Sequence, residues 1–205
     1  EKIEISLTKN IPSEAGLGGG SSDAGFFLKL LNEHYGNVYN EKELEELAMK
    51  VGSDVPFFIK NKTARVGGKG NKVELVENNL KDSLILVKPL GFGVSTKDAY
   101  NSFDELDEVR YANFEKIVEC LRNDNRKDLE KYIENGLEQG ISERNADIKM
   151  FKAILNSVVP GKKFFMSGSG STYYTFVTEI ERSQIETRLR TFVDNVKIII
   201  SKTIN

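Results

Sequence analysis

The first residues of the chain alternate between apolar and polar side chains. Ile3, Ile5 and Leu7 are separated by charged or polar residues, and a period of two is typical of a strand with one buried face. We therefore expect a half-buried strand over residues 3–8. Such a strand needs a neighbour, and it opens the chain without a lead-in. We expect its first partner to lie upstream and the chain to be a piece of a longer protein.

Further along, the spacing of apolar residues becomes that of amphipathic helices. Ala24, Phe27, Leu28 and Leu31 show the pattern, and Gly36 is a natural stop. The same spacing predicts helices over residues 22–35, 41–51, 97–103, 114–121, 129–139, 147–157 and 180–193. Short apolar runs predict strands over residues 83–89, 164–166, 173–177 and 197–201, a hairpin over residues 63–76, and a turn at residues 52–56 that leads into the apolar run 57–59.

The mixture of these elements favours an α+β fold over a doubly wound sheet, because helices and strands do not strictly alternate. The polar run at residues 78–82 is a plausible linker. We predict an N-terminal domain over residues 1–82 and a C-terminal domain over residues 83–205.

Composition excludes several classes of function. The chain has 29 Lys and Arg against 31 Asp and Glu, so nothing draws it in general to nucleic acid or to an acidic membrane. Its single cysteine, Cys120, lies in a helical pattern, and we interpret it as a buried structural thiol. The single histidine, His34, rules out a zinc site built from His and Cys and is expected at a helix end on the surface. We expect a cytoplasmic protein, without a signal peptide or a membrane span.

The stretch GLGGGSSDA at residues 16–24 is the most informative part of the chain. A glycine-rich turn at the start of a helix lets backbone N–H groups approach phosphate oxygens closely. Ser21 and Ser22 can cap this helix or offer hydroxyl groups to phosphate or to Mg²⁺. The stretch therefore predicts a phosphate-binding loop.

Three known phosphate loops do not fit the stretch. It lacks the lysine of the Walker A loop, it has serine where the Rossmann fingerprint ends in glycine, and it opens a helix where the protein-kinase loop joins two strands. The simplest alternative is a flexible turn with a helix cap, although one glycine would suffice for that.

Four motifs in the same order resemble those of the GHMP small-molecule kinases. They are PSEAGLGGGSS at residues 12–22, GSDVPFF at 52–58, VSTKDAY at 94–100 and MSGSGST at 166–172. The last three resemble the branch whose acceptor is a cytidine-diphosphate-linked methylerythritol. The resemblance implies the two-domain fold of this family, with a truncated N-terminal part like ribosomal protein S5 and a ferredoxin-like C-terminal domain.

The resemblance also implies an activity and its residues. The γ-phosphoryl group of ATP would pass, with Mg²⁺, to the 2-hydroxyl of this small-molecule acceptor, in non-mevalonate isoprenoid synthesis. Asp54 matches the catalytic aspartate, and Ser95, Thr96, Gly168 and Gly170 match the acceptor side. ATP would be bound by Lys9, Pro12, Ser13, Glu14, Ala15, Gly16, Leu17, Gly18, Gly19, Gly20, Ser21 and Ser22. We expect no protein metal site, no nucleic-acid or membrane partner, and a monomer or weak homodimer.

Local structural roles compete with these functional ones. Asp54 could form an Asx turn or cap a helix, and Ser95 or Thr96 could cap the helix that follows. Gly168 and Gly170 could serve only a tight turn between strands. Asn135 matches a family asparagine of unclear role. Arg65 and Lys69, beside the hairpin, are expected to be solvated.

One departure from the family pattern lowers the activity that we expect of this chain alone. The family's catalytic lysine and its cytosine contacts lie upstream of residue 1, so we expect the parent protein to be active and this piece to be weak or inactive alone. Two other functions remain open. One is a GHMP kinase with a mevalonate- or homoserine-type acceptor, and the other is a non-catalytic nucleotide-binding fragment.

Overall fold

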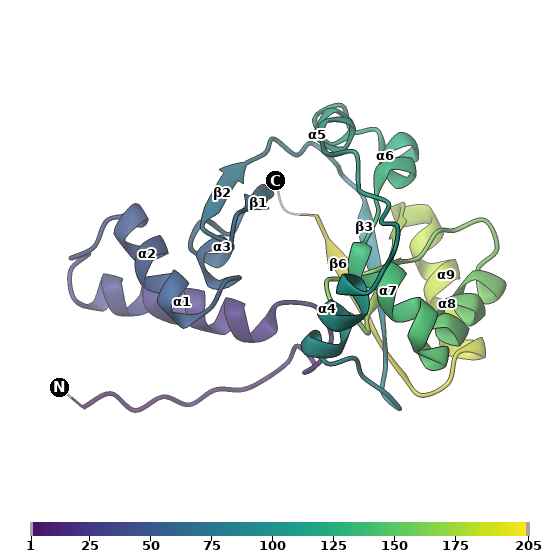
Figure 1. Cartoon of the computed structure of the whole chain (residues 1–205), viewed down its shortest axis with the longest axis horizontal. Coiled ribbons are helices and arrows are strands. Elements are labelled where there is room, and N and C mark those ends of the chain that lie inside the picture. Colours follow the sequence, from purple (N-terminus) through teal and green to yellow (C-terminus); the bar gives the residue numbers. More distant parts are fainter. Residues whose placement is uncertain (1, 204–205) are drawn as a thin grey trace.

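The computed structural model describes residues 2–203 and has an α+β architecture, as predicted. Figure 1 shows two groups of elements that face each other across the molecule, one built from α1–α3 with a hairpin and one built around a larger sheet. The helices are α1 (Gly19–His34), α2 (Glu41–Val51), α3 (Val55–Lys60), α4 (Thr96–Asp104), α5 (Phe114–Arg122), α6 (Arg126–Tyr132), α7 (Gly136–Arg144), α8 (Ala146–Val158) and α9 (Glu179–Phe192). The strands are β1 (Ala64–Gly67), β2 (Lys72–Leu75), β3 (Ser83–Pro89), β4 (Phe165–Met166), β5 (Tyr173–Val177) and β6 (Val196–Lys202).

The larger sheet has the strand order β4-β5-β3-β6, and every neighbouring pair is antiparallel. Its side chains alternate between two buried faces, as the period of a strand requires. Ile85 and Val87 of β3 join the main core with α8 and α9. Leu84 of β3 and Phe176 of β5 join a second cluster with α5 and α6 on the other face. Helices therefore cover both faces of an antiparallel sheet.

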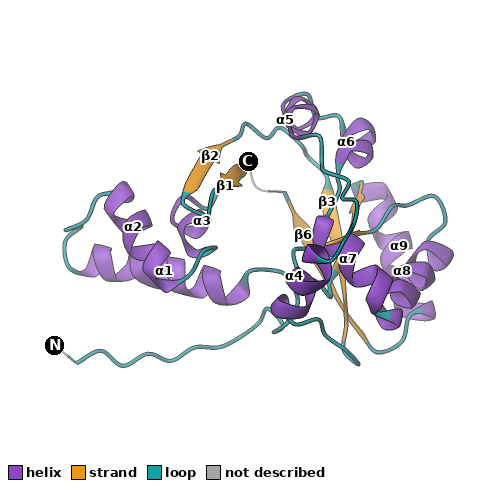
Figure 2. Cartoon of the chain, in the orientation of Figure 1, coloured by secondary structure: helices purple, strands orange, loops and turns teal. Residues whose placement is uncertain are grey.

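The smaller group is held together by a separate apolar cluster. Leu44 and Ala48 of α2 pack against Val55 and Ile59 of α3, and α1 contributes partly buried residues. The hairpin formed by β1 and β2 lies beside these helices (Figure 2), and it confirms the hairpin predicted from residues 63–76.

Residues 3–8 do not form the predicted strand. Ile3, Ile5 and Leu7 are 47%, 62% and 60% exposed, and the segment carries no strand pairing within residues 2–203. Figure 1 shows it as an extended tail that runs below α1. The alternating pattern gives an extended backbone, but a strand forms only where a neighbour supplies the ladder of hydrogen bonds.

The structure also corrects the start of one predicted helix and the continuity of another, and it shows that the run 57–59 is helical. The helix α1 starts at Gly19 and not at residue 22, because Gly18 takes a left-handed conformation (φ 63°) and its carbonyl accepts the first helical bond from Ser22 N–H at 2.8 Å. The helix predicted over residues 129–139 is two helices, α6 and α7, separated at Ile133–Asn135. The run 57–59 belongs to α3, which starts one residue after Asp54.

The expectations for Cys120 and His34 are confirmed. Cys120 is a free, buried thiol, and burial raises its pKa. His34 is exposed in the last turn of α1. Arg65, expected to be solvated, lies with its guanidinium 4.6 Å from the centre of the Phe114 ring, so the hairpin contacts α5. No helix in the described part of the chain is both long enough and apolar enough to span a bilayer.

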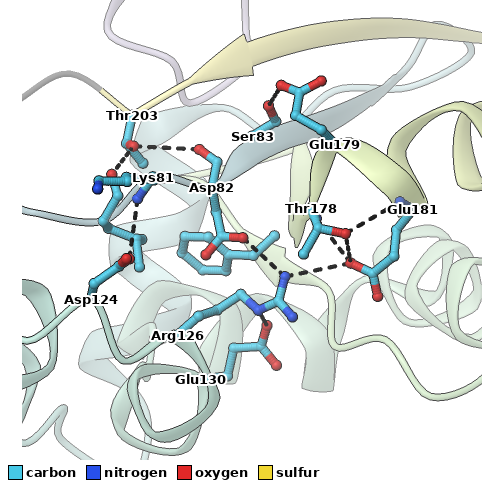
Figure 3. A network of polar contacts seen from close by, with 12 residues as sticks. Lys81, Asp82, Ser83, Asp124, Arg126, Glu130, Thr178, Glu179, Glu181 and Thr203 are labelled. Carbon is cyan, nitrogen blue, oxygen red and sulfur yellow. Dashed lines mark hydrogen bonds and ion pairs between the residues drawn. The ribbon is translucent and has the colours of Figure 1, made fainter.

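A network of charged groups lies where the chain enters the larger sheet (Figure 3). Arg126 on α6 donates to Asp82 at 3.0 Å and to Glu181 at 3.5 Å. Glu181 on α9 also accepts from Lys162 at 2.8 Å and from both the backbone and the hydroxyl of Thr178. The network therefore joins β3, α6 and α9.

The pKa values of two carboxyl groups in this network, Asp82 and Glu181, shift in opposite directions. Burial raises the pKa of Asp82, despite the nearby Arg126. Burial also acts to raise the pKa of Glu181, but hydrogen bonds from Lys162 and Thr178 outweigh it and bring that pKa from 4.5 down to about 2. Glu181 therefore stabilises the fold above its unfolded pKa, and this contribution is lost as the pH falls from 4.5 towards 2.

We predict that Glu181→Gln flattens the acid side of the stability curve. The wild-type unfolding midpoint should fall as the pH drops from 4.5 towards 2, and the variant should lose part of this slope because residue 181 no longer binds a proton. Thermal unfolding at a series of pH values measures the effect. Glu186→Gln on the same helix, which removes an exposed pair with Arg190, is the control. An equal slope in wild type and Glu181→Gln would contradict the prediction.

Candidate active site

A cleft of about 540 Å³ lies between the two groups of elements. It brings together five segments that are distant in sequence: the glycine loop with the residues before it, the turn before α3, the start of α4, the start of α7 and the loop between β4 and β5. The lining residues are Lys9, Pro12, Ser13, Glu14, Ala15, Gly16, Leu17, Gly18, Gly19, Gly20, Ser21, Asp54, Thr96, Tyr100, Leu137, Gly168 and Ser169.

The glycine loop presents backbone to the cleft because several of its residues have left-handed backbone angles. Glu14, Gly16 and Gly18 have φ values of 50°, 65° and 63°. The loop runs directly into α1, whose first turn carries no side-chain cap. Unpaired N–H groups and the positive end of the helix dipole therefore border the cleft, which is an arrangement that binds anions.

The loop between β4 and β5 packs against the glycine loop backbone to backbone. The Ser167 hydroxyl donates to the Gly16 carbonyl at 2.8 Å, and Ser171 N–H donates to the Glu14 carbonyl at 3.3 Å. A Cβ atom placed on Gly168 would lie 2.9 Å from the Gly16 carbonyl oxygen. Gly168 therefore has two structural roles. It belongs to the connection between two strands, and it permits a close approach to the glycine loop.

Asp54 reaches the cleft from the turn before α3. It occupies the N-cap position, but its side chain forms no capping hydrogen bond and is exposed. The capping role that competes with a functional one is therefore absent. The tip of the hairpin supports this turn, because a Cβ atom on Gly70 would overlap the Ser53 carbonyl oxygen.

Three of the predicted site residues do not line the cleft. The Ser22 hydroxyl donates to the Gly19 carbonyl at 2.8 Å, inside the first turn of α1. Ser95 is the N-cap of α4, where its side chain accepts from Asp98 N–H at 3.0 Å. Gly170 is buried behind the loop, against the Met166 side chain. Each of them shapes a segment that contributes other residues to the cleft.

The remaining polar groups come from both sides of the cleft. Lys9 forms an ion pair with Asp23 of α1, which ties the tail to the helix that follows the glycine loop. On the opposite side, the Thr96 hydroxyl lies 3.3 Å from that of Ser169. The hydroxyl groups of Thr96 and Ser169 do not cap α4, because Ser95 is the N-cap residue of this helix.

Sequence reasoning missed three lining residues, which are Tyr100, Leu137 and Ser169. Tyr100 is 54% exposed and stands one turn along α4 from Thr96. It belongs to the VSTKDAY motif, so the motif itself carried the signal. Leu137 carries no such signal, because only the packing of α7 brings it to the cleft.

Asn135 now has a structural role. Its side-chain oxygen accepts from Leu137 and Glu138 N–H and caps α7, while its amide donates to the Met166 and Gly168 carbonyls, both at 2.9 Å. One side chain thereby starts a helix and fixes the loop between β4 and β5.

The described residues contain no group of three or more His, Cys, Asp or Glu side chains placed to hold a metal ion.

The fold and the glycine-lined cleft place the protein among the GHMP kinases. Residues 1–62 match the family described as "GHMP kinases N terminal domain". A crystal structure of 4-(cytidine 5'-diphospho)-2C-methyl-D-erythritol kinase superimposes with a TM-score of 0.74 and 26% identity, over 95% of this chain and 68% of that one.

Curated relatives narrow the assignment. The chain is 79% identical over all its 205 residues to a 4-diphosphocytidyl-2-C-methyl-D-erythritol kinase from Fusobacterium nucleatum and spans 70% of it. It is 35% identical to the protein of the same name from Clostridium botulinum, over 89% of this chain and 65% of the relative. The chain belongs to the 4-diphosphocytidyl-2-C-methyl-D-erythritol kinase family.

We predict that Gly16→Ala destabilises the protein far more than Gly36→Ala. Both glycines have positive φ values, 65° and 83°, so both variants carry a strain of about 1–2 kcal/mol. Only at Gly16 does the new methyl group meet backbone atoms, including the Gly170 nitrogen at 2.8 Å, whereas Gly36 has open space within 4 Å. Denaturant unfolding of the two variants measures the difference. Equal losses of stability would show that the two loops are not in close contact.

Proposed function

We propose that the protein is an ATP-dependent kinase that phosphorylates the 2-hydroxyl of 4-diphosphocytidyl-2-C-methyl-D-erythritol, a step of non-mevalonate isoprenoid synthesis. The observation that carries this proposal is the meeting of the glycine loop and Asp54 in one cleft. The acceptor is inferred from the two relatives, which share this name. Nothing in the cleft favours a mevalonate- or homoserine-type acceptor instead.

The triphosphate of ATP would lie against the glycine loop and the start of α1. Backbone N–H groups at a helix N-terminus stabilise phosphate oxygens, and the glycines leave room for them. Lys9 adds a positive charge at the same end of the cleft, next to its partner Asp23. Fixed donors of this kind stabilise the charge that develops on the transferred phosphoryl group.

A magnesium ion is compatible with this arrangement. A nucleotide-bound Mg²⁺ keeps water molecules and takes oxygen ligands from the phosphates, so it needs one or two groups from the protein. The Ser21 hydroxyl lines the cleft at the start of α1 and would supply such a ligand. The ion would neutralise negative charge on the phosphates.

Asp54 would act on the acceptor. Its carboxylate is exposed in the cleft and is not used as a helix cap. It can therefore orient the acceptor hydroxyl towards the γ-phosphate and take its proton as the new P–O bond forms. The Gly70 contact behind Ser53 holds the turn that carries this carboxylate.

The rest of the acceptor would lie towards α4. Thr96 offers a hydroxyl group, and Tyr100 offers a further aromatic face that suits the cytosine base, in addition to the family's contacts upstream of residue 1. Ser95, Gly168 and Gly170 act indirectly by shaping this side. We assign the ATP side to a domain of residues 1–82 and the acceptor side to a domain of residues 83–205, in a cytoplasmic monomer or weak homodimer.

We predict that Asp54→Asn lowers kcat by about 10²–10⁴-fold, the usual range for loss of a general base. ATP affinity should stay within about twofold, because Asn keeps the shape of the side chain and the glycine loop itself is unchanged. Steady-state phosphorylation of the acceptor, with protein expressed from its whole gene, measures kcat, and titration with a nucleotide measures affinity. Asp147→Asn, in the exposed first turn of α8, is the control. Full turnover by Asp54→Asn would refute the assigned role.

We predict that Tyr100→Ala raises the KM for the acceptor and leaves the KM for ATP unchanged. Loss of one stacked base corresponds to about 1–3 kcal/mol, or roughly 5- to 150-fold. Initial rates at varied acceptor and at varied ATP separate the two constants. Tyr111→Ala removes a tyrosine that is 80% exposed and absent from the cleft lining, and it should change neither constant. An increase confined to the KM for ATP would place Tyr100 on the other side of the cleft.

A further inference from the structure

A buried lysine lies behind the glycine loop, outside the cleft. Lys88 is in β3 and is 5% exposed. Its ammonium group donates to the Pro89 carbonyl at 2.9 Å, to the Phe92 carbonyl at 3.2 Å and to the Ser171 hydroxyl at 2.7 Å. All three acceptors are electrically neutral. Buried lysines are rare because removing the charge from water is costly, so this position needs an explanation.

The contacts of Lys88 match its protonated form. A carbonyl oxygen can only accept, and the Ser171 hydroxyl itself donates to the Phe92 carbonyl at 3.5 Å, so the hydroxyl oxygen accepts from Lys88. Three donated bonds match the three N–H groups of an ammonium ion and exceed the two of a neutral amine. Burial lowers the pKa of Lys88, and the charge of Glu14 opposes this change. The Glu14 carboxylate is therefore close enough to favour the charged form of Lys88.

The partners of Lys88 lead directly to the glycine loop. Ser171, which is fully buried, donates its backbone N–H to the Glu14 carbonyl at 3.3 Å. The Glu14 carboxylate lies over the turn that Lys88 holds, because a Cβ atom on Gly93 would be 2.6 Å from its Oε2. Glu14 therefore contacts, through its carbonyl and its carboxylate, the two segments that Lys88 ties together.

Glu14 is the residue of the loop that most needs such support. Its φ of 50° is left-handed, and a residue with a Cβ atom in this region persists only where the surroundings hold it. The angle at Glu14 sets the direction of the chain into Gly16 and Gly18, and so the direction of the backbone N–H groups that face the cleft.

We propose that Lys88 is a positioning residue that orders the glycine loop through Ser171 and Glu14. It touches neither substrate and acts by cross-linking the turn at residues 89–93 to the loop between β4 and β5. The effect on the loop is independent of the proposed function, whereas the effect on ATP rests on it.

The test compares Lys88→Met with Lys162→Met. Lys162 is the matched control, since its side chain is 13% exposed and also donates to a backbone carbonyl, that of Phe176, but its ion-pair partner is Glu181 in the network away from the cleft. Hydrogen exchange of the amides of residues 13–20, without nucleotide, measures the order of the loop. Titration with ATP measures binding.

We expect amide exchange in residues 13–20 to become about tenfold or more faster in Lys88→Met and to be unchanged in Lys162→Met, because hydrogen bonds to a charged group are among the stronger ones. The ATP dissociation constant should rise by a similar factor in Lys88→Met only. Equal exchange in the two variants would overturn the proposal. Wild-type protein that fails to bind ATP would count against the proposed function, while the exchange data would still decide the role of Lys88.

A second variant covers the case in which Lys88→Met does not fold. Ser171→Ala removes the link and leaves Lys88 with two carbonyl partners, so it should increase exchange in the same amides. The double variant should be no worse than the more affected single variant, because both changes break one connection. Additive effects, or no effect of Ser171→Ala on the loop, would refute the proposed link.

Discussion

The contact between two loop backbones is the constraint on which this structure depends. Gly16 and Gly168 approach so closely that neither tolerates a Cβ atom without displacement of its neighbour, and the Ser167 hydroxyl and the Ser171 N–H fasten the contact. This contact closes the cleft between the two groups of elements and fixes the left-handed residues that direct backbone donors towards a phosphate. Glycine is required here for access as much as for its conformational freedom.

Three other parts of the protein hold the segments around this contact in place. Asn135 holds the loop between β4 and β5 from the side of α7, Lys88 holds it from inside the sheet, and the hairpin holds the turn of Asp54 through Gly70. The side chains of Asp54, Thr96 and Tyr100 are exposed, whereas Asn135 is half-buried and Lys88 is buried. Such a division suits phosphoryl transfer, in which positioning and fixed electrostatics supply most of the catalysis.

Sequence reasoning succeeded where the information is local. Amphipathic spacing located most of the helices, although α3 was expected only as an apolar run. The motifs predicted the family, which the comparisons confirm, and the role of Asp54 stays a prediction. Sequence reasoning failed where contacts between distant residues determine the local structure. The apolar positions Leu129, Ile133 and Leu137 continue a helical pattern across a break that Asn135 creates with partners some thirty residues away. The exposed tail shows the converse, since alternation alone cannot make a strand. The division at residues 82 and 83 stays a prediction.

The bond from Ser167 to Gly16 spans 151 positions of the chain. A ribosome that makes the protein from its N-terminus therefore completes the glycine loop long before it makes the segment that shapes this loop. Until residues 167–171 have emerged and the central strands have paired, Glu14 has no partner for its carbonyl, and the left-handed turn lacks its support. Competence to hold a phosphate group should thus appear in one late step, because the contact that shapes the loop joins two segments so far apart in the sequence.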